Sequence, residues 1–106
     1  MNEDTLQILF KTILERKANP TDNSYTASLL GKGIDKILKK LGEESTELVI
    51  AGKGGERDEI IYETADLIYH ILVLLAYQDV SLDEIYGELH RRFGMSGIEE
   101  KSLRVK

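Results

Sequence analysis

The chain has 106 residues, of which 42% are hydrophobic and 31% charged, a balance typical of one soluble globular domain over residues 1–106. Its net charge of −5 argues against a broad nucleic-acid-binding surface, and the absence of cysteine excludes disulfides, zinc–thiolate sites and thiol catalysis. An acidic protein that binds phosphate must therefore recruit cations locally, from lysines or from a metal.

The N-terminal residues lack the basic start and apolar run of a signal peptide. Apolar residues then recur at helical spacing and predict a first helix over residues 4–18, ended by Asn19-Pro20. Ser24 is a suitable cap for a short helix through Leu30. The segment Gly31-Lys32-Gly33 is expected to break it.

A longer helix is predicted over residues 34–51, with a glycine-rich stop and tight turn over residues 52–55. The next helix spans residues 57–77. A turn over residues 78–80 leads to Ser81 and Glu84, whose capping-box spacing starts a last helix that reaches about Phe93. Gly94 and Gly97 loosen the chain before a mixed-charge tail. The pattern predicts an all-α antiparallel bundle of four to five helices.

The helix over residues 57–77 is apolar around most of its circumference, so we expect it to be buried on most sides. Its most apolar segment, residues 67–76, is too short to span a bilayer and contains His70. We therefore expect a cytoplasmic protein without a membrane partner. The strongly polar residues Glu63, Asp66 and His70 share one stripe with Glu59, within roughly 60° of one another.

Two acidic pairs are expected to face each other across a helix–helix seam. Glu63 and Asp66 are three positions apart, as are Glu44 and Glu47 on the preceding helix. The glycine-rich turn makes these two helices antiparallel neighbours. Carboxylates that face one another in a partly buried seam repel and lose hydration, so they must be protonated, paired with lysine or bound to a divalent cation.

A divalent cation is favoured because the stripe of Glu63 and Asp66 carries no basic residue. Ligation by oxygen atoms suits Mg²⁺, and Mn²⁺ is possible. The alternative is that each pair is an ordinary solvated helix surface, with Lys40–Glu44 and Lys39–Glu43 as surface ion pairs. Of the two roles open to Glu43, outer contact of the metal site or surface partner of Lys39, we favour the second.

The acidic pattern, with fifteen residues between Glu47 and Glu63, resembles the signature of the MazG-like all-α nucleoside triphosphate pyrophosphohydrolases. Within that superfamily, the sequence is more similar to the phosphoribosyl-ATP pyrophosphatases of histidine biosynthesis. The similar segments are SYTASLL at 24–30, KILKKLGEE at 36–44, YETADLIYH at 62–70 and SGIEEK at 96–101. The chain is similar to the stand-alone form rather than to fusions with the enzyme of the next step.

The resemblance implies Mg²⁺-dependent hydrolysis of the α–β phosphoanhydride of phosphoribosyl-ATP to phosphoribosyl-AMP and pyrophosphate, the second step of L-histidine biosynthesis. It also implies a helical homodimer or higher homo-oligomer, to which the apolar helix lends support. In this interpretation Glu44, Glu47, Glu63 and Asp66 hold the metal. Glu47 is the preferred base for an attacking water, followed by Glu44.

Other side chains have less decisive patterns. Lys36, Lys40, Ser24 and Thr26 are candidate phosphate contacts, although solvation, capping and packing also account for them. His70 is expected to be a hydrogen-bonded core residue rather than a catalytic one. The rival interpretations are a house-cleaning dNTP pyrophosphatase of the same superfamily and a non-catalytic helical dimerisation module.

Overall fold

The computed structural model describes residues 4–93, which form the five helices α1 (Thr5–Ala18), α2 (Tyr25–Lys32), α3 (Ile34–Gly54), α4 (Arg57–Tyr77) and α5 (Leu82–Arg91). No strand occurs within these residues, so the all-α prediction is confirmed. The tail predicted from Gly94 onward, including the segment at 96–101, lies outside them.

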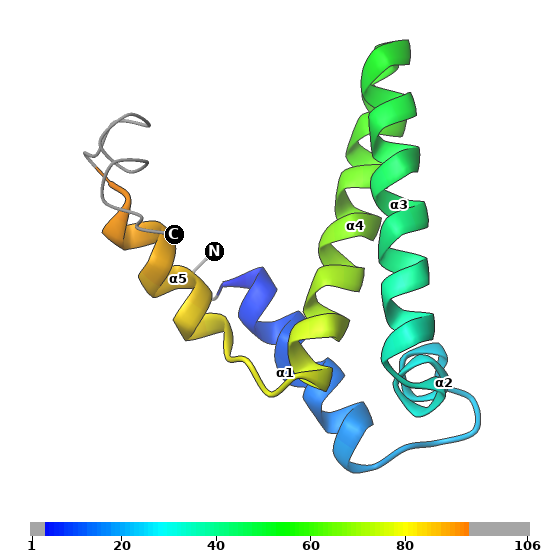
Figure 1. Cartoon of the computed structure of the whole chain (residues 1–106), viewed down its shortest axis with the longest axis vertical. Coiled ribbons are helices and arrows are strands. Elements are labelled where there is room, and N and C mark those ends of the chain that lie inside the picture. Colours follow the sequence, from blue (N-terminus) through cyan, green and yellow to red (C-terminus); the bar gives the residue numbers. More distant parts are fainter. Residues whose placement is uncertain (1–3, 94–106) are drawn as a thin grey trace.

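Helices α3 and α4 form a long antiparallel hairpin, the most extensive helix pair in the described chain (Figure 1). Helix α1 packs against the second half of α4, and α2 crosses near the start of α3 (Figure 1). The core lies where these helices meet. It is built around the buried side chains of Ile13, Leu29, Ile37 and Val73. The core occupies one end of the hairpin. The other end, which contains the turn at Gly55, projects beyond the core and is called the arm here.

Two helix starts follow the caps predicted at Ser24 and Ser81. Ser24 accepts a hydrogen bond from the amide of Ala27 at 3.0 Å and so caps α2. Ser81 and Glu84 form the reciprocal capping box at the start of α5. Asp4 caps α1 through the amide of Leu6. These side chains satisfy amides that the first turn of a helix leaves without partners.

Three helix ends differ from the prediction. Helix α3 runs three residues past the predicted Ala51, to Gly54, because Gly52 and Gly54 keep helical geometry. The stop falls at Gly55, whose φ of 81° lies in the left-handed region that glycine adopts without strain. Helix α2 likewise continues to Lys32 and ends at Gly33, with φ 95°. Helix α5 ends at Arg91, two residues earlier than expected.

The expectation that α4 is buried on most sides is wrong for the single chain. Its buried side chains are His70, Leu72, Val73 and Ala76, all in the second half. In the first half Ile61 and Tyr62 are 57% and 67% exposed, because α1 and α2 pack farther along. Helix α4 is long and apolar enough to cross a membrane by length and composition alone, a test that core helices also pass. Its two acidic residues facing α3 are more readily explained by a protein seam than by lipid.

Candidate metal centre between helices α3 and α4

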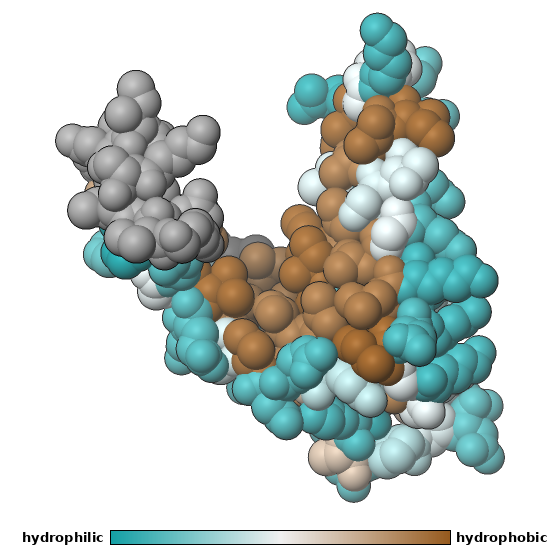
Figure 2. Space-filling model, in the orientation of Figure 1, coloured by the Kyte–Doolittle hydropathy of each residue, from teal (hydrophilic) through white to brown (hydrophobic). Residues whose placement is uncertain are grey.

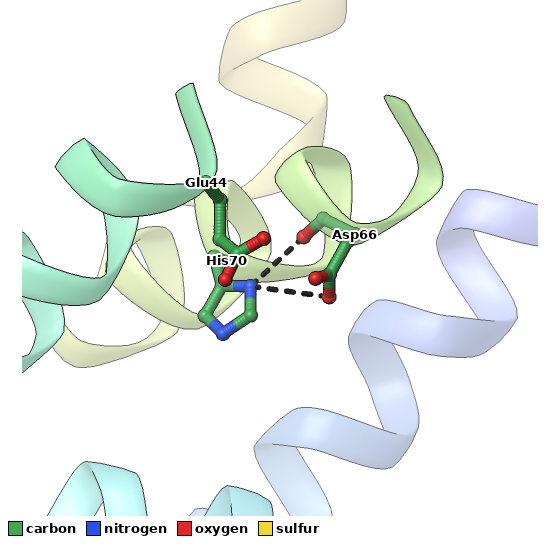
Figure 3. Close-up of side chains that lie close together, drawn as sticks. All are labelled: Glu44, Asp66 and His70. Carbon is green, nitrogen blue, oxygen red and sulfur yellow. Dashed lines mark hydrogen bonds and ion pairs between the residues drawn. The ribbon is translucent and has the colours of Figure 1, made fainter. Parts of the chain in front are cut away.

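The four predicted carboxylates gather around Glu44 in the seam between α3 and α4. Oxygen atoms of Glu44, Glu47 and Glu63 lie within 4.8 Å of one another. Ligand atoms of Glu44, Asp66 and His70 form a second such group, which shares Glu44 with the first. Figure 3 shows Glu44 reaching from α3 toward Asp66 and His70 on α4. The structure therefore brings together the two acidic pairs that the helical spacing placed on facing sides.

Burial is uneven across the cluster. Glu44 is 6% exposed, and it is the one buried acidic residue among residues 4–93. Glu47, by contrast, lies at the solvent edge. One carboxylate oxygen of Glu44 and one of Glu63 are buried without a hydrogen-bond partner in the described chain. An ionised carboxylate oxygen accepts hydrogen bonds and donates none, so two facing carboxylates cannot satisfy each other without a proton or a cation between them.

The crowding of these carboxylates also raises the pKa values of two of them. A hydrogen bond shared with the Asp66 carboxyl, followed by burial, raises the pKa of Glu44 to about 7. Burial, followed by the charge of Glu47, raises the pKa of Glu63. Protonation of Glu44 near neutral pH relieves this repulsion in the protein without metal, and a cation held by the same carboxylates would relieve it as well.

A divalent cation that prefers oxygen fits this site on three observations. The donors of the Glu44, Glu47 and Glu63 group are all carboxylate oxygens, which suit Mg²⁺ and Mn²⁺. Two of the cluster's oxygens are buried and unpartnered. The charges of Asp66 and Glu47 help to raise the pKa of Glu44, and the same negative charges would stabilise a bound cation.

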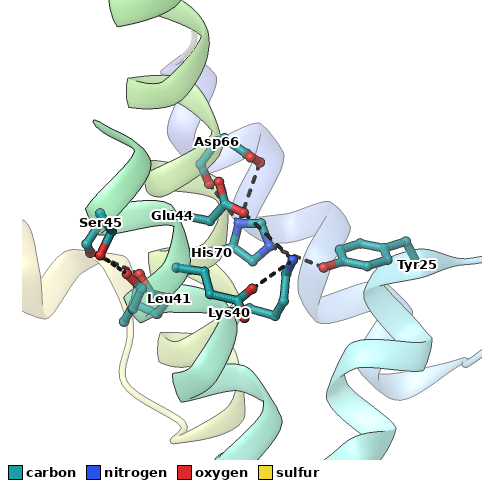
Figure 4. A network of polar contacts seen from close by, with 10 residues as sticks. Tyr25, Lys40, Leu41, Glu44, Ser45, Asp66 and His70 are labelled. Carbon is teal, nitrogen blue, oxygen red and sulfur yellow. Dashed lines mark hydrogen bonds and ion pairs between the residues drawn. The ribbon is translucent and has the colours of Figure 1, made fainter. Parts of the chain in front are cut away.

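Lys40 is the lysine that contacts this cluster in the described chain. Its ammonium nitrogen lies 3.8 Å from Glu44 (Figure 4) and 3.4 Å from Glu43. Glu43 therefore pairs with Lys40, three positions earlier, and the predicted partner Lys39 is wrong. No ion pair between Lys36 and an acidic residue is found within residues 4–93.

The hydroxyl groups of the 24–26 segment have partners inside the protein. Ser24 caps α2, and the Thr26 hydroxyl hydrogen-bonds the Tyr69 hydroxyl. Neither contact requires substrate, so their predicted phosphate contacts remain predictions.

Tyr25 is a contact that the spacing of residues did not reveal. Its hydroxyl lies 3.3 Å from Nε2 of His70, and the two residues are 45 positions apart in the sequence. The ring of His70 is buried, with Nδ1 2.9 Å from the Asp66 carbonyl oxygen, which confirms the expected hydrogen-bonded core histidine. Only the packing of α2 across α4 could have brought Tyr25 to the site.

Comparison with known proteins gives this geometry a family. The model of the phosphoribosyl-ATP pyrophosphohydrolase family matches residues 6–93. The chain is 72% identical over 104 residues to a phosphoribosyl-ATP pyrophosphatase from Geotalea daltonii, with 98% of each chain covered. It is 67% identical to the corresponding protein from Geobacter metallireducens, over 100% of this chain and 99% of the relative.

A further relative is the histidine biosynthesis bifunctional protein HisIE from Caldanaerobacter subterraneus. It is 54% identical over 86% of this chain, and the match covers 46% of the relative. By the family match and by these identities, the chain belongs to the phosphoribosyl-ATP pyrophosphohydrolase family.

Proposed function

We propose that this chain hydrolyses phosphoribosyl-ATP to phosphoribosyl-AMP and pyrophosphate in histidine biosynthesis, using a divalent cation held by Glu44, Glu47, Glu63 and Asp66. The substrate follows from the names of the relatives. The observation that supports the chemistry is the four-carboxylate cluster with two buried, unpartnered oxygens. A bound Mg²⁺ or Mn²⁺ would neutralise charge on the phosphate oxygens and on the pyrophosphate leaving group.

The positions of Glu44 and Glu47 suggest different roles for the two carboxylates. Glu44 is central to both groups of ligand atoms and buried, so its task is to bind the cation rather than to exchange protons with solvent. Glu47 is exposed and within 4.8 Å of the same oxygens, so it has access to a water molecule. We therefore assign the orientation and deprotonation of the attacking water to Glu47.

Lys40 is the phosphate contact that the geometry favours among the four candidates. Its ion pairs with Glu43 and Glu44 hold the ammonium group at the edge of the acidic cluster, where a substrate phosphate would approach. The ammonium group at that edge supplies positive charge that the carboxylate cluster itself lacks. Lys36, Ser24 and Thr26 are weaker candidates for the same contact.

We further propose that the active protein is a homodimer in the cytoplasm. The arm of the α3–α4 hairpin exposes Val49, Ile50, Ile61 and Tyr62, which are 57–70% exposed. Figure 2 shows apolar side chains along this arm and in the hollow between it and α5. Only 22% of the most apolar 18-residue stretch of α4 is buried within the described chain. Apolar surface of this extent is typical of a subunit interface.

A paired assay tests the substrate. Pyrophosphate release should be measured side by side with phosphoribosyl-ATP and with a panel of deoxynucleoside triphosphates, each across a Mg²⁺ titration. The proposal predicts turnover of phosphoribosyl-ATP and restored histidine-free growth in a strain that lacks this step. Preference for a deoxynucleotide would indicate a house-cleaning enzyme, and no Mg²⁺ binding at all would indicate a dimerisation module.

A further inference from the structure

His70 lies in the middle of a chain of hydrogen bonds that runs from α4 to α2. Its Nδ1 atom is 2.9 Å from the carbonyl oxygen of Asp66 and 3.5 Å from a carboxylate oxygen of the same residue. On the other side of the ring, Nε2 is 3.3 Å from the Tyr25 hydroxyl. Figure 4 shows the ring between these two partners, and Figure 3 shows its contacts with Asp66. Both ring nitrogens are therefore engaged.

These contacts fix the tautomer of the neutral ring. A carbonyl oxygen can only accept a hydrogen bond, so the nitrogen facing it must carry the hydrogen. Nδ1 of His70 is then the donor to Asp66, and Nε2 has the lone pair that accepts from the Tyr25 hydroxyl.

The tautomer decides between two roles for His70. By distance alone, the residue could serve as a ligand together with Glu44 and Asp66. A nitrogen that carries a hydrogen has no lone pair for a metal, and the other nitrogen faces Tyr25. Hard cations such as Mg²⁺ also prefer oxygen to nitrogen. The ring is thus placed to hold Asp66 rather than to bind the cation.

The surroundings restrict the ring further. His70 is 3% exposed and meets the Tyr69 ring edge-on, with the ring centroids 5.0 Å apart. The Tyr25 ring meets it at a similar angle from α2, with 6.2 Å between centroids. A buried ring with both nitrogens engaged and aromatic neighbours has little freedom to rotate.

We propose that His70, held by Tyr25, is a positioning residue for Asp66 at the metal centre. Its ring donates to the Asp66 carbonyl oxygen and lies 3.5 Å from a carboxylate oxygen of the same residue, which limits where that carboxylate can move. The inference rests on the proposed metal site and adds to it the residues that orient one of its ligands. Partners of this kind commonly change metal affinity or activity by about 10–100-fold. Tyr25 extends the effect to the first turn of α2, so the start of that helix is tied to the site.

Two substitutions separate the two nitrogens of the ring. In His70→Asn the side-chain amide can take the place of Nδ1 and keep the donor to Asp66, whereas in His70→Gln it takes the place of Nε2 and loses that donor. We expect Mn²⁺ affinity, measured by electron paramagnetic resonance, to fall by about 10–100-fold in His70→Gln and by much less in His70→Asn. Tyr25→Phe should give a smaller loss than His70→Gln, and His90→Gln serves as the exposed control.

Equal affinity in His70→Gln and the parent protein, with an unchanged circular dichroism spectrum, would overturn the proposal. If His70→Gln fails to fold, His70→Asn and Tyr25→Phe still decide it, because an intact affinity in Tyr25→Phe together with a lost affinity in His70→Asn contradicts the assigned donor. Absence of Mn²⁺ binding in the parent protein would instead refute the proposed function.

Nitrogen NMR of the parent protein tests the tautomer without any metal assay. The chain has two histidines, so His90→Gln assigns the signals. We expect Nδ1 of His70 to show the shift of a hydrogen-bearing nitrogen at neutral pH, both before and after Mg²⁺ is added. A hydrogen on Nε2 instead, or a ring nitrogen that shifts to a metal-bound value, would overturn the assignment.

Discussion

Among the carboxylates of the site, Glu44 has the most strongly raised pKa. The hydrogen bond shared with Asp66, followed by burial, raises the pKa of its carboxyl group to about 7. A carboxyl whose folded pKa exceeds its unfolded value stabilises the fold below the unfolded pKa and loses that stabilisation as pH rises through the folded pKa. The metal-free protein should therefore lose free energy of unfolding between about pH 4.5 and 7 through this group.

Glu44→Gln tests this electrostatic cost directly. The amide removes the charge that repels Asp66, so at pH 8 the metal-free variant should have a higher Tm than the parent protein. The difference should shrink toward pH 5, where the parent's Glu44 is protonated. Glu43→Gln, next in sequence but exposed and paired with Lys40, is the matched control and should leave the pH dependence unchanged. A lower Tm for Glu44→Gln at pH 8 would contradict the assignment.

At this scale the sequence predicted which carboxylates meet, because i, i+3 spacing puts each pair on one helix face. It did not predict the contact between Tyr25 and His70, which depends on how α2 crosses α4. It also assigned Glu43 to Lys39 rather than Lys40, because both spacings are compatible with a helix and only the observed geometry selects one.

The α3–α4 hairpin is the element that creates the site, and one glycine sets its turn. Glu44 and Glu47 face Glu63 and Asp66 because the chain reverses at Gly55, which has φ 81°. The sequence predicted the limits of α4 correctly but ended α3 too early. Several glycines in a row signal a stop without identifying the residue that adopts the left-handed conformation.

A pair of glycine substitutions tests the position of this stop. Gly55→Ala forces a side chain into the left-handed region and should lower the free energy of unfolding by about 1 kcal/mol. Gly52→Ala lies inside α3, where the added Cβ meets no atom of the described chain within 4 Å apart from the adjoining residues and backbone of its own helix. It should raise the free energy of unfolding by about 0.5–1 kcal/mol. Urea denaturation at one fixed protein concentration measures both. Effects of the same sign would contradict the assigned helix end.

At the scale of the molecule, residues 4–93 leave one end of the α3–α4 hairpin uncovered. The sequence indicated that α4 is apolar around most of its circumference, which would suit a core helix. Within residues 4–93, however, no other helix covers Ile61 and Tyr62 in the first half of α4. Sequence reasoning could identify the apolar surface but could not tell burial by the same chain from burial by a second copy. The number and length of the helices here are too small to enclose it.

Substitutions on this arm test the proposed dimer. Replacing Ile61 and Tyr62 together by serine should convert a dimer into a monomer at micromolar concentration, because both side chains are more than half exposed in the single chain. Light scattering after size-exclusion chromatography measures the mass. Lys53→Ser, a polar change on the same arm, should leave the dimer intact. A monomeric parent protein at the same concentration would contradict the proposal.

The most direct test of the metal-dependent hydrolase is pyrophosphate release from phosphoribosyl-ATP by Glu63→Gln and Asp66→Asn across a Mg²⁺ titration. Glu59→Gln, one turn earlier on α4 and exposed, is the matched control. We predict that both site variants lose at least about 100-fold in kcat and need more Mg²⁺, while the control stays close to the parent protein. Near-normal turnover and an unchanged Mg²⁺ requirement in both site variants would contradict the account.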